Sequence, residues 1–253
     1  MKNMKKVLAV LLAGMMLLGL CACGATSEKT YVIYSDNAFA PFEYLDSATN
    51  AYVGVDMDLL AAIAEDQGFQ YELRASDWRA AVSAFTSHQA DVLMGSMTVT
   101  QNRIDGGWYF SHSFYDGITQ SMAMVSGSDA ITPDELAGNA VAVVSGTVGA
   151  TYAQSIKDRY GFSIATFNDS PSMYESVLKG HAAACFADTP VLRRSIENGV
   201  ALEIVDGSES EAVGYCAAVC DGKNQPFLDL FDRGLEHIRA SGVYDRILAK
   251  YTK

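Results

Sequence analysis

The sequence is poor in basic residues and has a large excess of acidic ones. It contains 18 lysines and arginines against 30 aspartates and glutamates, which gives a formal net charge of −12. A nucleic-acid-binding surface needs clustered lysine and arginine to neutralise phosphates, and anionic lipid attracts the same residues. The charge balance therefore argues against nucleic acid as a partner and against electrostatic adhesion to an anionic membrane.

Long apolar runs are absent after the first 20 residues, so nothing further along the sequence predicts a transmembrane helix. The one run, from Val7 to Leu20, follows three lysines and is short for a membrane span, which is the pattern of a signal peptide. It ends in the letters LCAC at positions 20–23, which resemble the lipobox of bacterial lipoproteins. The alternative is an ordinary secretory peptide that is cut nearby.

The lipobox resemblance implies a processed and anchored protein. Residues 1–22 would be the signal peptide, Cys23 would be lipidated, and residues 23–30 would form a tether. The mature chain would keep 30 acidic against 15 basic residues, because all three lost lysines lie in the signal peptide. We expect an extracytoplasmic protein, held by lipid at the outer face of the cell membrane or in the periplasm.

Cysteine and histidine are scarce. Three of the five cysteines lie beyond Cys23, at Cys185, Cys216 and Cys220, and the four histidines fit no common metal-ligand spacing. Cys216 and Cys220 occupy one strand-like run, where they would be about 13 Å apart and too distant to bridge each other. A bond from Cys185 to either one stays open. We expect buried thiols, no metal and no cofactor.

Strand-like and helix-like segments alternate along the rest of the sequence, which predicts parallel α/β sheets. In the helix predicted at 56–68, Asp56 is the expected N-cap and Gly68 the expected end. The alternation restarts near residue 115, which indicates two α/β lobes with a ligand cleft between them. Two long helical patterns, at 225–240 and 243–251, finish the chain.

Several motifs resemble the bacterial extracellular solute-binding proteins for polar amino acids, the binding components of ABC importers. They include SDNAFAPFEY at 35–44, ADVLMGSMTVTQNR at 90–103, VAVVSGTVGATYA at 141–153 and AACFADTP at 183–190. Each motif alone is weak, but together they follow the family order over nearly the whole mature chain. One departure is visible: the stretch RIDGGWYFS at 103–111 is one residue longer than is usual in the family.

The resemblance implies a two-lobe, periplasmic-binding-protein-like fold of type II, in which two crossing segments form a hinge. Lobe 1 would comprise residues 31–113 and 213–253, and lobe 2 would comprise residues 114–212. Such proteins close around their ligand.

Arg103 and the hydroxyls before it suit a carboxylate, because a guanidinium makes two-pronged contacts with one. The resemblance assigns Arg103, Ser96 and Thr98 to the α-carboxylate of an amino acid, through hydroxyl and backbone N–H groups. Val148 would add an N–H group at a helix start. The alternatives are a surface ion pair for Arg103 and a plain strand-to-helix turn at Val148.

The remaining candidates match family positions around the ligand's other groups. Asp188 would take the α-ammonium, Phe39 and Trp78 would sandwich the side chain, and Asp36 would bond a side-chain nitrogen. The structural alternatives are a helix cap for Asp188, core packing for Phe39 and Trp78, and a turn cap for Asp36.

The charges of these candidates favour a cationic side chain. Two aspartates and one arginine leave the pocket at −1, so arginine, lysine, ornithine or histidine would neutralise it, whereas an acidic ligand would not. Glutamine stays possible, although Val144 stands where glutamine-preferring relatives often carry lysine. Cystine is also open, and Arg79 would change the count if it entered the pocket.

We therefore expect a monomeric binding protein, not an enzyme, that delivers an amino acid to an ABC transporter permease. One alternative is an exported dehydratase-like enzyme on the same fold, with a cleft carboxylate as general acid. Another is the sensor lobe of a receptor, which would need a transmembrane segment after the domain.

Overall fold

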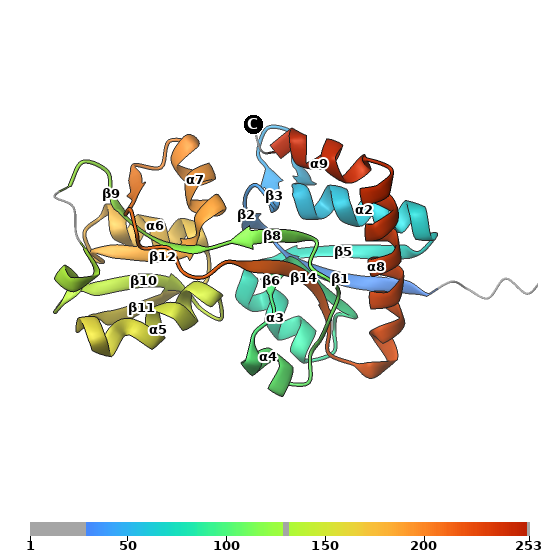
Figure 1. Ribbon diagram of the computed structural model, residues 1–253, viewed down its shortest axis with the longest axis horizontal. Coiled ribbons are helices and arrows are strands. Elements are labelled where there is room, and N and C mark those ends of the chain that lie inside the picture. The colour runs from blue at the N-terminus through green and yellow to red at the C-terminus, as the bar shows by residue number, and fades with distance from the viewer. Residues whose placement is uncertain (1–28, 129–131, 252–253) are drawn as a thin grey trace, which may run out of the picture. The chain divides into compact units, whose positions relative to one another are not determined.

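The computed structural model describes residues 29–128 and 132–251, and the expected signal peptide, Cys23 and most of the tether lie outside them. The unit that runs from Tyr31 to Lys253 is a mixed α/β fold with two sheet-containing lobes (Figure 1). Among the described residues, no helix has both the length and the apolar character needed to cross a membrane.

The first sheet has the strand order β5-β1-β6-β14-β7, with β8 also paired to β14. Its centre is β6, in which all seven residues are buried, as expected for a strand covered on both faces. The strands are β1 (Thr30–Asp36), β5 (Gln70–Ser76), β6 (Val92–Thr98), β7 (Tyr109–Phe110), β8 (Tyr115–Ile118) and β14 (Val213–Val219).

The helices of the first lobe divide between two groups in Figure 1. Helices α2, α8 and α9 pack on one another, and their apolar side chains form one core with the sheet. Helix α3 packs on β5 and β6, and the short α4 follows β6. The bounds are α2 (Val55–Gln67), α3 (Trp78–Thr86), α4 (Gln101–Asp105), α8 (Gln225–Ala240) and α9 (Val243–Tyr251), with the 3-10 turn η2 (Gly222–Asn224) before α8.

The expected N-cap of α2 was wrong. Gly54 occupies the N-cap position, and Asp56 lies inside the first turn, fully buried. The other end was correctly predicted, because Gly68 closes α2 in the left-handed conformation that glycine adopts without strain. Position 54 requires glycine, since a Cβ there would lie 1.9 Å from the carbonyl oxygen of Phe42.

A small antiparallel sheet lies between β1 and α2 and was not predicted. Its strands are β2 (Ala38–Phe39), β3 (Glu43–Asp46) and β4 (Ala51–Val53). Strands of two to four residues are too short to show the two-residue alternation on which strand prediction depends. This sheet places Phe39 and Glu43 opposite each other.

The second sheet has the order β11-β10-β12-β9-β13, with α5 on one face and α6 and α7 on the other (Figure 1). Its strands are β9 (Gln120–Val125), β10 (Ala140–Val144), β11 (Ser163–Phe167), β12 (Ala184–Asp188) and β13 (Leu202–Ile204). Its helices are α5 (Val148–Tyr160), α6 (Ser170–Leu178) and α7 (Thr189–Glu197), with the 3-10 turn η1 (Pro133–Leu136) before β10.

Both sheets are mixed rather than wholly parallel. The β1–β6, β10–β11 and β10–β12 pairs are parallel, but β14 runs antiparallel to β6, and β9 runs antiparallel to β12. The chain passes from the first sheet to the second between β8 and β9, and returns between β13 and β14. The expected lobe boundaries near residues 113 and 213 stay predictions, and β8 belongs to the first sheet.

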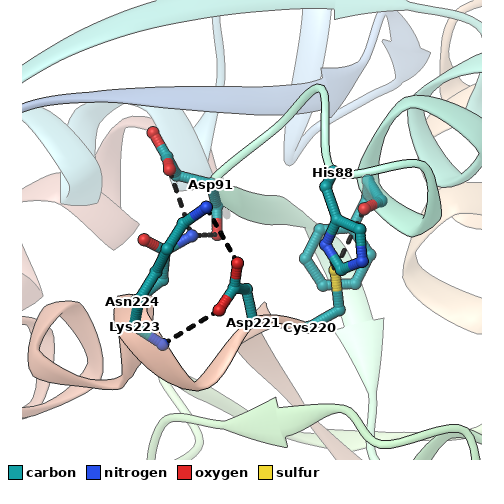
Figure 2. Close-up of polar contacts among 7 residues, drawn as sticks. His88, Asp91, Cys220, Asp221, Lys223 and Asn224 are labelled. Atoms are coloured by element: carbon teal, nitrogen blue, oxygen red, sulfur yellow. Dashed lines mark hydrogen bonds and ion pairs between the residues drawn. The ribbon is translucent and has the colours of Figure 1, made fainter.

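The three cysteines of the described residues are free thiols. Cys185 and Cys216 are buried, and Cys220 is partly exposed at the end of β14 (Figure 2). There its Sγ lies 3.0 Å from the carbonyl oxygen of Phe85 and 3.7 Å from Nδ1 of His88, a neighbour that the sequence did not indicate.

Polar contacts beside Cys220 join the start of α8 to the loop before β6 (Figure 2). The Asn224 amide donates to the backbone carbonyl and the carboxylate of Asp91, at 3.2 and 3.1 Å. Lys223 pairs with Asp221 at 2.8 Å. These contacts anchor the chain that follows β14, and this structural role is sufficient to explain them.

Candidate functional site

Side chains from both lobes line one cavity. The cavity has a volume of about 530 Å³ when its open mouth is included. All eight predicted ligand-binding residues line it: Asp36, Phe39, Trp78, Ser96, Thr98, Arg103, Val148 and Asp188. The structure thus brings together residues that are up to 152 positions apart in the printed numbering, and their contacts with a ligand stay a prediction.

Contacts within the protein hold the Arg103 side chain in place. It lies in α4, directly after β6, where the Thr100 hydroxyl caps the helix. Its guanidinium donates to the carbonyl oxygens of Thr98 (2.5 Å) and Gly146 (3.2 Å), and arginine has five N–H donors, so others remain for a ligand. Burial lowers the pKa of Arg103 to about 10, while nearby Asp188 partly opposes that shift.

Two tryptophans also position this guanidinium. Its carbon lies 5.7 Å from the ring centre of Trp78 and 5.5 Å from that of Trp108, within cation–π range. Trp108 belongs to the stretch that is one residue longer than usual, and its role at Arg103 was not predicted. The sequence gives no local signal for it, because the packing depends on the turn at 106–107.

Thr98 and Val148 line the same cavity as Arg103. The Thr98 hydroxyl is buried and has no hydrogen-bond partner among the described residues. Val148 is the first residue of α5, whose N-cap is Thr147, so its N–H has no acceptor within the helix. A Cβ on Gly149 would lie 2.8 Å from the Phe186 carbonyl, so this helix start packs closely against β12.

Asp188 ends β12 and is the N-cap residue of α7, but its side chain makes no capping hydrogen bond. Its carboxylate instead accepts a short hydrogen bond from the Tyr215 hydroxyl, which comes from β14 of the other sheet. Burial raises the pKa of Asp188, and the contacts of Tyr215, Gln120 and Arg103 oppose that rise. The sequence did not indicate Tyr215, which lies 27 residues away.

Asp36 ends β1 and does act as a turn cap. Its Oδ1 accepts the Ala38 N–H at 3.0 Å. Burial raises the pKa of Asp36 to about 6, and two acidic N-caps, Asp77 of α3 and Asp169 of α6, add to the rise. A cation placed at Asp36 would relieve both the burial and the repulsion.

Trp78 and Phe39 belong to the cavity wall as well as to apolar clusters. Trp78 is 5% exposed, and its indole Nε1 has no hydrogen-bond partner among the described residues. Phe39 is partly buried and lies 6.2 Å from the ring of Phe42. The expected sandwich around a ligand side chain stays a prediction.

Ser96 lines the cavity, but its donors point elsewhere. Its N–H donates to Asp56 at 2.9 Å and its hydroxyl to Glu43 at 3.0 Å. A contact of Ser96 with a ligand carboxylate stays a prediction, and in this structure both donors of Ser96 already have acceptors. Of the two acceptors, Asp56 was expected only as the N-cap of α2.

Arg79 does not enter the cavity. Its side chain is exposed and donates to Asn168 at 3.4 Å. In the described part of the chain, no group of three or more histidine, cysteine, aspartate or glutamate side chains is placed to hold a metal ion. The cavity therefore combines one cation, two carboxylates, aromatic faces and unpaired N–H and O–H donors.

The comparisons with known proteins agree with this arrangement. The "Probable histidine-binding protein" of Neisseria gonorrhoeae is 30% identical over 98% of this chain and 96% of its own length. A solved structure, "An ancestral arginine-binding protein bound to arginine", is 25% identical with a TM-score of 0.80, covering 88% of this chain and 98% of that one. A second, "An ancestral arginine-binding protein bound to glutamine", is 26% identical with a TM-score of 0.78, covering 88% and 97%.

The family description "Bacterial extracellular solute-binding proteins, family 3" matches residues 31–253, the same range as the unit from Tyr31 to Lys253. Neither that description nor the three relatives carries the name of an enzyme. With the two lobes, the cavity and these matches together, this chain belongs to the bacterial extracellular solute-binding proteins of family 3.

Proposed function

We propose that this protein binds a free amino acid with a cationic side chain: arginine, lysine, ornithine or histidine. The observation that carries the proposal is the convergence of Arg103, Asp188 and Asp36 in one largely buried cavity. An α-amino acid with a basic side chain carries one anion and two cations, and these three residues supply the opposite charge for each.

The ligand would lie with its α-carboxylate at Arg103, Thr98 and the Val148 N–H. The unpaired Thr98 hydroxyl and the free helix start support this orientation. Asp188, already bonded to Tyr215, would take the α-ammonium. The side chain would then run between Phe39 and Trp78 toward Asp36, with Ser96 as part of the wall.

The net charge of the cavity supports a cationic side chain. Asp36 and Asp188 outnumber Arg103, and Arg79, which would have changed the count, lies on the surface. An acidic ligand would add a further unpaired charge, which costs several kcal/mol in a buried site. Val144 lines the cavity where a lysine would favour glutamine.

We further propose that the protein is a monomer that presents its ligand to an ABC transporter permease. Residues 31–113 with 213–253, and residues 114–212, would be the two lobes, joined at the two crossings between the sheets. Lipidation of Cys23 after removal of residues 1–22 would hold the protein at the outer face of the membrane. The relatives' binding names and the motifs at the N-terminus support this placement.

Calorimetry tests the ligand. The protein is unfolded and refolded to strip bound solute, then titrated with the standard amino acids, ornithine and cystine. Tight binding of a basic amino acid and no response to glutamate are expected. Binding of glutamine alone would overturn the charge argument, and it is the second candidate because a related structure holds that ligand. No binding across the panel would overturn the amino-acid assignment.

The enzyme alternative is tested on the same sample. A dehydratase on this fold would consume its substrate, so ligand recovered after long incubation would show loss of water. We expect the amino acid to be recovered unchanged, because in the proposed orientation the carboxylates pair with the ligand's fixed charges and neither lies beside a leaving hydroxyl.

A further inference from the structure

Two carboxyl groups lie directly behind the wall of the cavity. Glu43 from β3 and Asp56 from α2 are both 0% exposed. They meet at Ser96, whose Oγ lies 3.0 Å from Glu43 Oε2 and 3.3 Å from both Asp56 oxygens. The distance from Glu43 Oε1 to a Cβ built on Gly95 is 3.5 Å, so only the thickness of β6 separates the pair from the ligand space.

The donors around the pair are too few for two ionised carboxylates. Ser96 supplies one N–H and one O–H, both already donated to the pair, and Glu43 Oε1 has no hydrogen-bond partner among the described residues. Both carboxyl groups contact the same Ser96 hydroxyl, whose single proton can be donated fully to only one of them. A proton on one carboxyl group would turn it from an acceptor into a donor and so reduce the shortage.

No cation offsets the charge of the pair. In the ranges 29–128 and 132–251, no ion pair includes Glu43 or Asp56. The titratable groups that face the pair from neighbouring strands are Asp36 of β1, Tyr52 of β4 and Tyr215 of β14, all acids. Like charges that share a dry site cannot both ionise at neutral pH.

The donors of Ser96 are divided unequally between the two groups. Asp56 accepts both the N–H and the hydroxyl of Ser96, whereas Glu43 accepts the hydroxyl alone. Burial raises the pKa of both groups, and the contacts with Ser96 oppose the rise. Because it has the additional donor, Asp56 is better placed to carry the negative charge, and Glu43 is better placed to keep a proton.

Resting on the proposed function, we propose that Glu43 and Asp56 share one proton, act as a single fixed negative charge behind Gly95 and Ser96, and so determine specificity for cationic ligands. The charge acts through space on the side-chain end of the cavity, where Glu43 and Asp36 are electrostatically coupled. The pair touches no ligand. It is a positioning and electrostatic element that turns a cavity of −1 into one of −2.

A matched pair of ligands tests the charge. Arginine and its neutral isostere citrulline are titrated calorimetrically at pH 8, and the ratio of their affinities is compared between variants. Glu43→Gln replaces a protonated acid by a neutral amide, so the ratio should stay within about twofold. The double variant Glu43→Gln with Asp56→Asn removes the shared charge, and the ratio should fall about tenfold, because the cationic ligand loses an attraction that a partly buried site screens less than water does.

The other protonation states give different results and would overturn the proposal. If both groups are ionised, Glu43→Gln alone lowers the ratio. If both are protonated, even the double variant leaves the ratio unchanged. If wild-type protein binds no basic amino acid at all, the proposed function fails instead. The two failures are thus distinguishable.

A spectroscopic measurement needs no variant. At pH 8 the wild-type protein should show the infrared C=O stretch of a buried, protonated carboxyl. Labelling glutamate carboxyls with ¹³C should shift that band, and labelling aspartate carboxyls should not. Absence of the band, or a shift with labelled aspartate alone, would place the proton elsewhere and overturn the proposal even if the double variant fails to fold.

Discussion

The acidic side chains around the cavity differ from those on the surface in burial and in partners. On the surface, Glu72 pairs with Arg74 at 2.8 Å and Glu175 with Lys179 at 2.5 Å, and in each case the base lowers the pKa of the acid. Around the cavity, Asp36 and Asp56 are buried without a basic partner, and their pKa values are raised. The same residue types thus serve two different purposes.

The difference separates the acidic residues that mainly give the surface its negative charge from those that could interact with a ligand. An exposed, paired acid contributes solubility and little else. A buried acid without a base is costly for the folded protein, and the cost is recovered only when something positive arrives. In this cavity Arg103 offsets part of the charge near Asp188, and in the proposed function a cationic ligand would offset the remainder.

The largest expected effect comes from removing the one cation of the cavity. Arg103→Ala should weaken binding of the amino acid by about 2–5 kcal/mol, because it leaves the ligand carboxylate buried and unpaired. Calorimetry measures the loss. Arg74→Ala is the matched control, since that arginine is exposed and paired with Glu72. A loss smaller than about threefold at Arg103 would reject the carboxylate assignment.

The second prediction concerns stability and pH in the ligand-free protein. Asp36 and Asp56 have an unperturbed pKa of 3.8 and folded values of about 6 and about 7. Between pH 3.8 and the raised pKa values, the folded state therefore binds more protons than the unfolded state. The stability that these two groups contribute is thus highest below about pH 4. It is then lost as the pH rises toward about 7.

Urea unfolding at pH 5 and pH 8 measures this slope. The free energy of unfolding should be lower at pH 8, and Asp36→Asn should reduce the difference by roughly 1.4 kcal/mol, which corresponds to the single pH unit between pH 5 and the raised pKa. The paired surface acids act in the opposite direction, but only at a more acidic pH, because their pKa values are lowered. Stability that rises between pH 5 and pH 8 would contradict the burial of these acids.

The third prediction separates side-chain recognition from recognition of the amino-acid backbone. Asp36→Asn should weaken arginine binding by about 10- to 100-fold, because it removes the charge nearest the expected side-chain cation. Binding of citrulline should change by less than about threefold, since an amide can still accept or donate a hydrogen bond. Calorimetry on the two ligands gives both numbers. Equal losses would show that Asp36 acts on the fold and not on specificity.

Much of this arrangement could be predicted from the sequence because it depends on local patterns. The helices at 225–240 and 243–251 were predicted at the bounds that the structure has. Arg103 follows the buried strand β6 of one sheet and Asp188 ends the buried strand β12 of the other, and ligands of α/β sheets bind beyond the carboxyl ends of strands. That rule and the family motifs placed all eight candidates around one cavity.

The parts that failed depend on contacts between distant segments. Tyr215 reaches Asp188 from another sheet, and Glu43 and Asp56 meet only because β3 and α2 pack behind Ser96. Asp56 has the residue type of a helix cap, yet Gly54, two residues earlier, is the N-cap, and Asp56 lies buried in the first turn. A local pattern cannot show which of two nearby residues will cap when the other has a buried partner.

The smallest expected effect comes from changing one of the exposed, paired acids. Glu175 and Lys179 form an i, i+4 pair on α6, and both side chains are about 60% exposed. Glu175→Gln should shift the melting temperature by about 1 °C or less, because exposed pairs gain little over hydration and are screened by salt. It should leave arginine affinity unchanged and the pH dependence of stability between pH 5 and pH 8 unaltered. Thermal melts in low and high salt check this, with Asp36→Asn as the contrasting buried acid. A shift in melting temperature as large as that of Asp36→Asn would mean that burial does not distinguish the two sets of acids.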